Sequence, residues 1–165
     1  MANKYKNTLL ILLKLISLPG IISILFLCEP VTATPINTKT VAQQTQTREI
    51  KKAADKAFVE AMKLFKKGTA ESLKQAIRKL QLAAKLYEEV GEKISQALSL
   101  VSIGIVYDSL GEKQQALQFF NQALPIFRAV GDRGGEANIL KSIGLVYSSL
   151  GEIQKALQFY NRALP

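Results

Sequence analysis

The chain has 165 residues, with 22 lysines and arginines against 13 aspartates and glutamates, which gives a formal net charge of +9 at pH 7. It contains no histidine and no tryptophan, and its single cysteine is Cys28. This composition excludes a histidine-dependent catalytic triad, a histidine metal site, a Cys–His dyad and a disulfide within one chain.

Residues 1–33 are typical of a signal peptide. Lys4 and Lys6 give a positive start, residues 8–28 are largely apolar, and small residues precede an expected cleavage after Ala33. The leader therefore predicts export, to a periplasmic or extracellular location. Two alternatives stay open: an uncleaved membrane anchor over residues 8–28, and lipidation at Cys28.

Residues 34–47 are rich in threonine, glutamine and asparagine and hold almost no large apolar side chain. A stretch of this composition cannot contribute to a core. We therefore predict a flexible spacer between the leader and the folded part.

Residues 48–90 predict a divergent first helix hairpin. Apolar side chains recur at helical spacing on both sides of Gly68, and glycine favours the end of a helix there. Residues 75–91 align without a gap with residues 115–131, and three extra residues precede them. We expect these three residues in the turn, and the hairpin to cap the N-terminal side of a stack.

The next two units, residues 91–130 and 131–165, contain near-copies of one segment. Residues 102–125 and 142–165 are identical at 18 of 24 positions, forty residues apart. Such a period is typical of stacked helix hairpins. The repeated apolar, glycine, aromatic and alanine positions are Leu100, Ile103, Gly104, Tyr107, Gly111, Ala116, Phe120 and Ala123, and then Leu140, Ile143, Gly144, Tyr147, Gly151, Ala156, Tyr160 and Ala163.

This pattern resembles the tetratricopeptide repeat (TPR) family. The sequence departs from the family's motif in two ways. A leucine replaces the aromatic residue that often opens the motif, and Pro125 and Pro165 fall earlier than the proline that usually closes it. The period and the segment from Gly131 to Ala137 resemble bacterial arrays that often precede caspase-like (CHAT) domains. The resemblance implies an all-α, right-handed α-solenoid of about three helix hairpins that binds other proteins.

The concave face of such a stack is lined by the first helices of the hairpins. By resemblance to TPR grooves, the partner-binding residues are Leu98, Val101, Ile105, Asp108, Ser109, Asn138, Lys141, Leu145, Ser148 and Ser149. Of the basic and amide residues that hold a terminal carboxylate in some TPR grooves, only Lys141 and Asn138 are present. We therefore expect a peptide laid along a mixed groove rather than a carboxylate clamp. The alternative is that these positions are tolerant surface sites.

Positive charge is concentrated in the first hairpin. Residues 48–90 carry 11 basic and 6 acidic residues, whereas residues 91–165 carry 7 and 6. This excess indicates either a solvated cap or a basic face for an acidic partner or anionic lipid. We do not expect nucleic acid, because no aromatic side chains alternate with the basic ones.

The last unit is about two turns shorter than its predecessor, with its final helix starting near Glu152. Leu157, Tyr160 and Leu164 are therefore expected to be partly uncovered, as at an interface. A fragment of a longer array, a truncated product, or coverage by another chain, including self-association at this end, would each account for this pattern.

The sequence predicts no catalysis. Its only cysteine lies in the leader, and Glu112 and Asp132 stand where helix starts favour acids. Gly131 and its neighbours join two helices and follow no strand, so no phosphate loop, metal or cofactor is expected. The predicted function is a non-catalytic module that binds a protein or peptide. The alternatives are a fragment of a longer peptidase or regulatory protein, and a structural module at a membrane surface.

Overall fold

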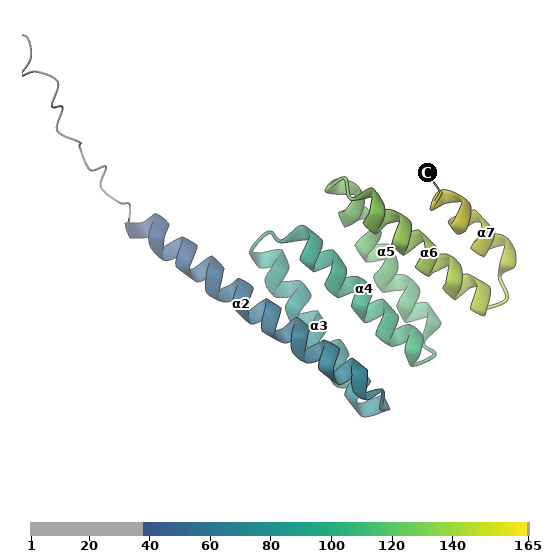
Figure 1. Ribbon diagram of the computed structural model, residues 1–165, viewed down its shortest axis with the longest axis horizontal. Coiled ribbons are helices and arrows are strands. Elements are labelled where there is room, and N and C mark those ends of the chain that lie inside the picture. Colours follow the sequence, from purple (N-terminus) through teal and green to yellow (C-terminus); the bar gives the residue numbers. More distant parts are fainter. Residues whose placement is uncertain (1–37, 165) are drawn as a thin grey trace, which may run out of the picture. The chain divides into compact units, whose positions relative to one another are not determined.

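The computed structural model describes residues 38–164, which form six α-helices joined by short turns (Figure 1). No strand occurs in this part of the chain. The helices are α2 (Thr38–Lys67), α3 (Ala70–Glu89), α4 (Lys93–Ser109), α5 (Lys113–Ala129), α6 (Arg133–Ser149) and α7 (Ile153–Arg162). The all-α fold of about three helix hairpins is therefore confirmed.

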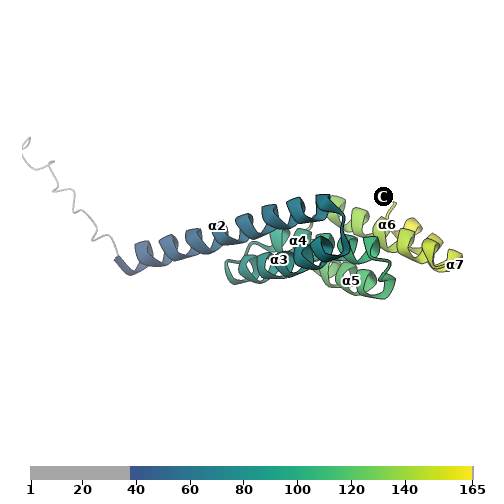
Figure 2. The same cartoon turned by 90° about the horizontal axis from the view of Figure 1, so that it is seen from below.

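The helices pair as α2 with α3, α4 with α5 and α6 with α7, and each hairpin packs against the next through α3 and α4 or α5 and α6. Figure 2 shows α2, α4 and α6 along one side of the stack, and α3 and α5 along the other. The second and third hairpins lie inside the predicted units 91–130 and 131–165. Helix α7 has 10 residues against 17 in α5, as its shorter apolar pattern predicted.

Each interhelical turn contains a glycine with φ between 69° and 79°. A side chain at these positions would be strained, because L-residues other than glycine rarely adopt positive φ. The glycines therefore end the first helices, where the sequence predicted. They also give a common register for comparing α2, α4 and α6: each helix can be counted backwards from Gly68, Gly111 or Gly151.

Helix α2 begins at Thr38, ten residues before its expected start at Arg48. The prediction of a flexible spacer over residues 34–47 is therefore wrong for residues 38–47, and residues 34–37 lie outside the described part. No proline or glycine interrupts residues 38–67, and adding a residue to an existing helix requires no new nucleation. The hydroxyls of Thr45 and Thr47 donate to the carbonyls of Val41 and Gln43, one turn earlier.

Helix α3 also begins earlier than expected. The three extra residues before the aligned segment lie in its first turn and not in the preceding loop, which is only Gly68 and Thr69. The Ser72 amide donates to Thr69 Oγ1, and the Thr69 amide donates to Ser72 Oγ, each at 3.1 Å. This capping box satisfies two amides that have no partner within the helix and so favours the early start.

The hairpins are held by aromatic rings that pack directly on glycine backbone. A Cβ atom placed on Gly104 would lie 2.5 Å from Phe120, and one on Gly144 would lie 2.5 Å from Tyr160. Between the second and third units, a Cβ on Gly135 would lie 2.3 Å from Phe127. These glycines are therefore required for the close approach of neighbouring helices, both within a hairpin and between hairpins.

The buried core follows the stack as successive clusters. One lies within the first hairpin, one joins the first and second hairpins, and one extends through the second and third. Tyr107 stacks on Phe119 and Tyr147 stacks on Phe159 at the edge of these clusters, with ring centroids 5.5 and 5.4 Å apart. The two copies thus repeat not only residues but contacts.

The predicted leader, residues 1–33, lies outside the described part of the chain. Between residues 38 and 164, no helix is both long and apolar enough to cross a lipid bilayer.

The glycine contact can be tested with Gly104→Ala. The added methyl group would overlap the Phe120 ring, which is itself 2% exposed and cannot swing into solvent. We expect a loss of about 1–3 kcal/mol in the free energy of unfolding, measured by urea denaturation, because overpacking outweighs the better helix propensity of alanine.

The matched control is Gly134→Ala, where the nearest atom outside the adjacent residues would be Asp132 Oδ1 at 3.5 Å, an ordinary contact. This variant should be neutral or slightly stabilising. Equal stability of the two variants would contradict the packing account.

Candidate partner-binding site

The ten residues predicted to line the groove lie on α4 and α6, and none of them is buried. Eight are exposed, whereas Val101 and Asp108 are half-buried. The apolar members Leu98, Ile105 and Leu145 are 47%, 42% and 63% exposed. Large apolar side chains at this level of exposure, on adjacent first helices, provide contact area for a partner.

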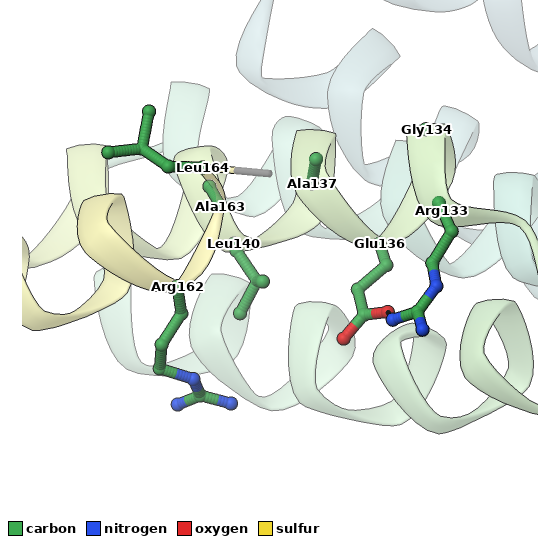
Figure 3. Close-up of a pocket in the computed structure, with 8 residues that line it drawn as sticks. All are labelled: Arg133, Gly134, Glu136, Ala137, Leu140, Arg162, Ala163 and Leu164. Carbon is green, nitrogen blue, oxygen red and sulfur yellow. Dashed lines mark hydrogen bonds and ion pairs between the residues drawn. The ribbon is translucent and has the colours of Figure 1, made fainter.

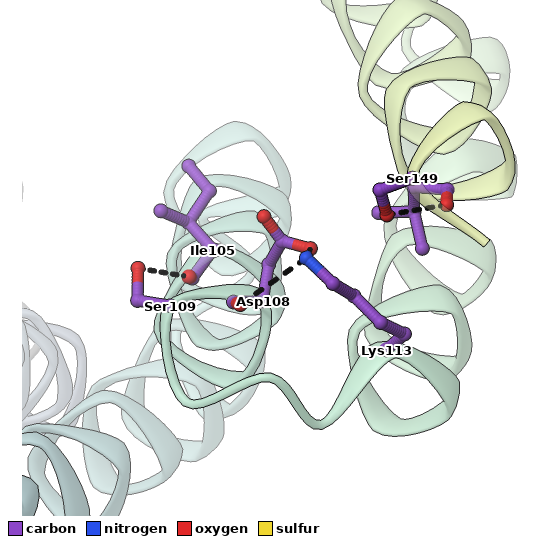
Figure 4. Close-up of polar contacts among 6 residues, drawn as sticks. Ile105, Asp108, Ser109, Lys113 and Ser149 are labelled. Carbon is purple, nitrogen blue, oxygen red and sulfur yellow. Dashed lines mark hydrogen bonds and ion pairs between the residues drawn. The ribbon is translucent and has the colours of Figure 1, made fainter.

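Three of the polar residues are engaged locally (Figure 4). Asp108 accepts from Lys113 Nζ at 2.7 Å, across the turn between α4 and α5. The hydroxyls of Ser109 and Ser149 donate to the carbonyls of Ile105 and Val146 in their own helices, at 2.9 and 2.8 Å. A partner would compete with these bonds, so these side chains offer less than their exposure suggests.

The other polar groove residues are available. Within the described part of the chain, the side chains of Asn138, Lys141 and Ser148 make no hydrogen bond or ion pair, and all three are exposed. Lys141 thus supplies a positive charge beside the exposed Leu145. Together they favour a partner segment that presents apolar side chains and a nearby carboxylate.

Val101 has a structural role as well. It is half-buried and packs against the cluster that joins the second and third hairpins. A polar replacement at this position would disturb the stack, so it is unsuited to a test of binding.

Helix α2 contributes residues that the sequence analysis missed. Met62 and Phe65 line a hollow of about 50 Å³ together with Ser102, Ile105 and Val106 of α4. Counted back from the turn glycines, Met62 is equivalent to Ile105 and Leu145. The spacing of these residues from the turn glycines was the available signal, whereas the residues predicted from the sequence to line the groove lie on α4 and α6 alone.

The surface of α7 that faces away from the stack is open. Leu157 is 48% exposed, whereas its equivalent Leu117 is 5% exposed because α6 covers it. Leu164 is also exposed and Tyr160 is half-buried, so the predicted uncovered face is present. A cavity of about 580 Å³ lies between the start of α6 and the end of α7, with Arg133 and Arg162 at its edges (Figure 3).

Glu136, at the edge of this cavity, links two hairpins. It accepts from Arg128 Nε of α5 at 2.7 Å and from Arg133 at 3.5 Å. The hydrogen bond from Arg128 lowers the pKa of Glu136 below its ordinary value. The carboxylate therefore stabilises the contact of α5 with α6 in its charged form.

The other carboxylates singled out in the sequence stand at helix starts. Asp132 Oδ1 accepts from the Gly135 amide at 2.8 Å and so caps α6. Glu112 occupies the equivalent position before α5 but makes no capping bond with its side chain. Among residues 38–164, no three aspartate, glutamate, cysteine or histidine side chains gather as a metal site would require.

The family model described as soluble NSF attachment protein, SNAP, matches residues 32–164. The chain belongs to this family. It is a helical repeat protein of the TPR type.

Among solved structures, the chain is similar to the TPR domain of Arabidopsis FLU, with a TM-score of 0.63 and 17% identity over 69% of this chain and 93% of that one. At this identity the likeness shows the fold alone. No curated protein matches. Neither match bears on the caspase-like context, which stays a prediction.

The link through Glu136 predicts a pH dependence. A lowered pKa in the folded state means that the stabilisation is complete above the unfolded pKa, near 4.5, and is lost as the pH falls through the folded value. We expect Glu136→Gln to lower the midpoint of urea unfolding at pH 7. The difference in midpoint between this variant and the unmodified protein should close only below about pH 4.5.

Glu88→Gln is the matched control, since Glu88 is exposed and forms no ion pair among the described residues. Its midpoint of urea unfolding should equal that of the unmodified protein at every pH. A gap for Glu136→Gln that persists unchanged at pH 2 would show that the ion pair is not its cause.

Proposed function

We propose that the chain is a non-catalytic interaction module that binds a peptide or protein along α2, α4 and α6. The observation that carries the proposal is that each of these first helices presents accessible apolar side chains at equivalent positions. Met62 and Phe65 of α2 line a hollow against α4, and Ile105 of α4 and Leu145 of α6 are exposed. The family description, which names an attachment protein, supports a role in binding other proteins.

The chemistry of these side chains suggests the form of the partner. An extended or helical segment would place one apolar side chain in the hollow between α2 and α4 and another against Leu145, with an acidic side chain toward Lys141. Three hairpins offer a limited contact area, so we expect modest, reversible binding.

We propose export as the setting for this interaction. The support is the sequence of residues 1–33, with its positive start, apolar stretch and small residues before the expected cleavage point. A partner is then to be sought in the cell envelope or outside the cell, and residues 8–28 as an uncleaved anchor would keep the module at the membrane.

The test is affinity capture from an envelope fraction, with the bound proteins quantified by mass spectrometry. The groove variant is Lys141→Glu with Leu145→Asp, since both residues are exposed and neither supports the core. We expect at least a tenfold loss of the partner, because the substitutions reverse the charge and remove the apolar contact.

The matched control is Leu82→Asp with Lys85→Glu, which makes the same chemical changes at exposed positions of α3, a second helix. It should capture the partner as the unmodified protein does. Undiminished capture by the groove variant, with both variants folded by circular dichroism, would move the site elsewhere.

A further inference from the structure

On α4 and α6, one side of the helix packs on the preceding hairpin, and the corresponding side of α2 differs from it in chemistry. Counted back from the turn glycines, Val106 and Ile103 of α4 correspond to Lys63 and Glu60 of α2. Val106 and Ile103 are fully buried against the preceding hairpin, whereas Lys63 is exposed. The equivalent positions of α6, Val146 and Ile143, are likewise buried and apolar.

Each carboxylate of α2 is bonded to a group other than Lys63, although Asp55 keeps its negative charge because its partner, the Tyr87 hydroxyl, is neutral. Glu49 pairs with Lys52 at 2.7 Å, and Glu60 pairs with Lys79 of α3 at 2.7 Å. Asp55 accepts a hydrogen bond from the Tyr87 hydroxyl at 2.7 Å.

Five basic side chains of α2 have no carboxylate within 4.0 Å among the described residues. We call them the basic face of α2: Arg48, Lys56, Lys63, Lys66 and Lys67. At 100° per residue they lie within about 100° of helix circumference, opposite the buried Ala54, Ala57 and Ala61. From Arg48 to Lys67 the face is about 29 Å long.

We propose that the basic face of α2 binds the surface of a membrane that contains anionic lipids. Each lysine near such a surface contributes independently to binding, and a straight helix can present all five side chains to one plane. Arg48 and the lysines have long side chains that reach headgroups without burial of the helix itself.

The composition of the face favours lipid over a protein partner. Protein interfaces are depleted in lysine and are organised around buried aromatic or apolar anchors. Here four of the five basic residues are lysines, and Val59 is the one large apolar side chain among them. Arg48 borders a hollow of about 440 Å³ that is lined by residues of α2 itself. A plane of anionic headgroups matches a long, lysine-rich surface with so little apolar area.

The experiment is sedimentation of the full chain with vesicles of phosphatidylcholine alone or with 30% phosphatidylserine. Residues 8–28 are largely apolar and would contribute equally to binding of both vesicle types. The ratio of the two partition coefficients therefore isolates the part of the binding that depends on lipid charge. We expect Lys56→Ala with Lys63→Ala to lower that ratio about 25-fold, which is about fivefold for each lysine. Alanine keeps the helix propensity of α2.

The matched control is Lys74→Ala with Lys85→Ala, an equal change of net charge at exposed lysines of α3 that form no ion pair in the described part. It should change the ratio at most twofold, and 0.5 M NaCl should abolish the preference for anionic vesicles in the unmodified chain. Equal losses in the two double variants, or no preference for phosphatidylserine at low salt, would overturn the proposal. Tighter binding to soluble polyglutamate than to the vesicles would also overturn it, in favour of an acidic protein.

Discussion

The close contact of an aromatic ring with a glycine backbone is the constraint on which the array depends. Phe120 on Gly104 and Tyr160 on Gly144 set the distance between the two helices of a hairpin, and Phe127 on Gly135 sets the distance between hairpins. Because the same device acts within and between units, the hairpins stack as a one-dimensional series in which each unit contacts only its neighbours. The glycines cannot vary without a shift of the rings, so the packing positions of the two copies remain alike.

The surface is free of that constraint, and there the copies diverge. Leu98 and Asn138 occupy equivalent exposed positions on the first helices, as do Ile105 and Leu145. The fold thus holds a set of accessible side chains at fixed separations without depending on their identity. This separation of roles is what allows a repeat scaffold to acquire a binding face at little cost in stability.

Much of the fold could be predicted from the sequence, because the forty-residue repeat and the turn glycines are both local signals. The start of α2 could not, since a threonine- and glutamine-rich stretch carries no apolar stripe, and its helix continues from residues anchored farther along the chain. The exposure of the groove positions followed from periodicity, but the bond of Asp108 to Lys113 depends on side-chain geometry across a turn. The hollow at Met62 and Phe65 depends on how two hairpins meet, which no single unit encodes.

Within the described residues, the outward faces of α2 and α7 have opposite chemistry, and this disfavours contact of one with the other. The α7 face presents Leu157 and Leu164, whereas the α2 face presents Lys56 and Lys63. Head-to-tail stacking would press these ammonium groups against leucines and bury charges without partners, which is strongly unfavourable. The charged first helix therefore acts against open-ended polymerisation, a hazard for any repeat whose units are alike. On the proposal that this face binds anionic lipid, the same lysines that disfavour such stacking would also make the contact with the headgroups.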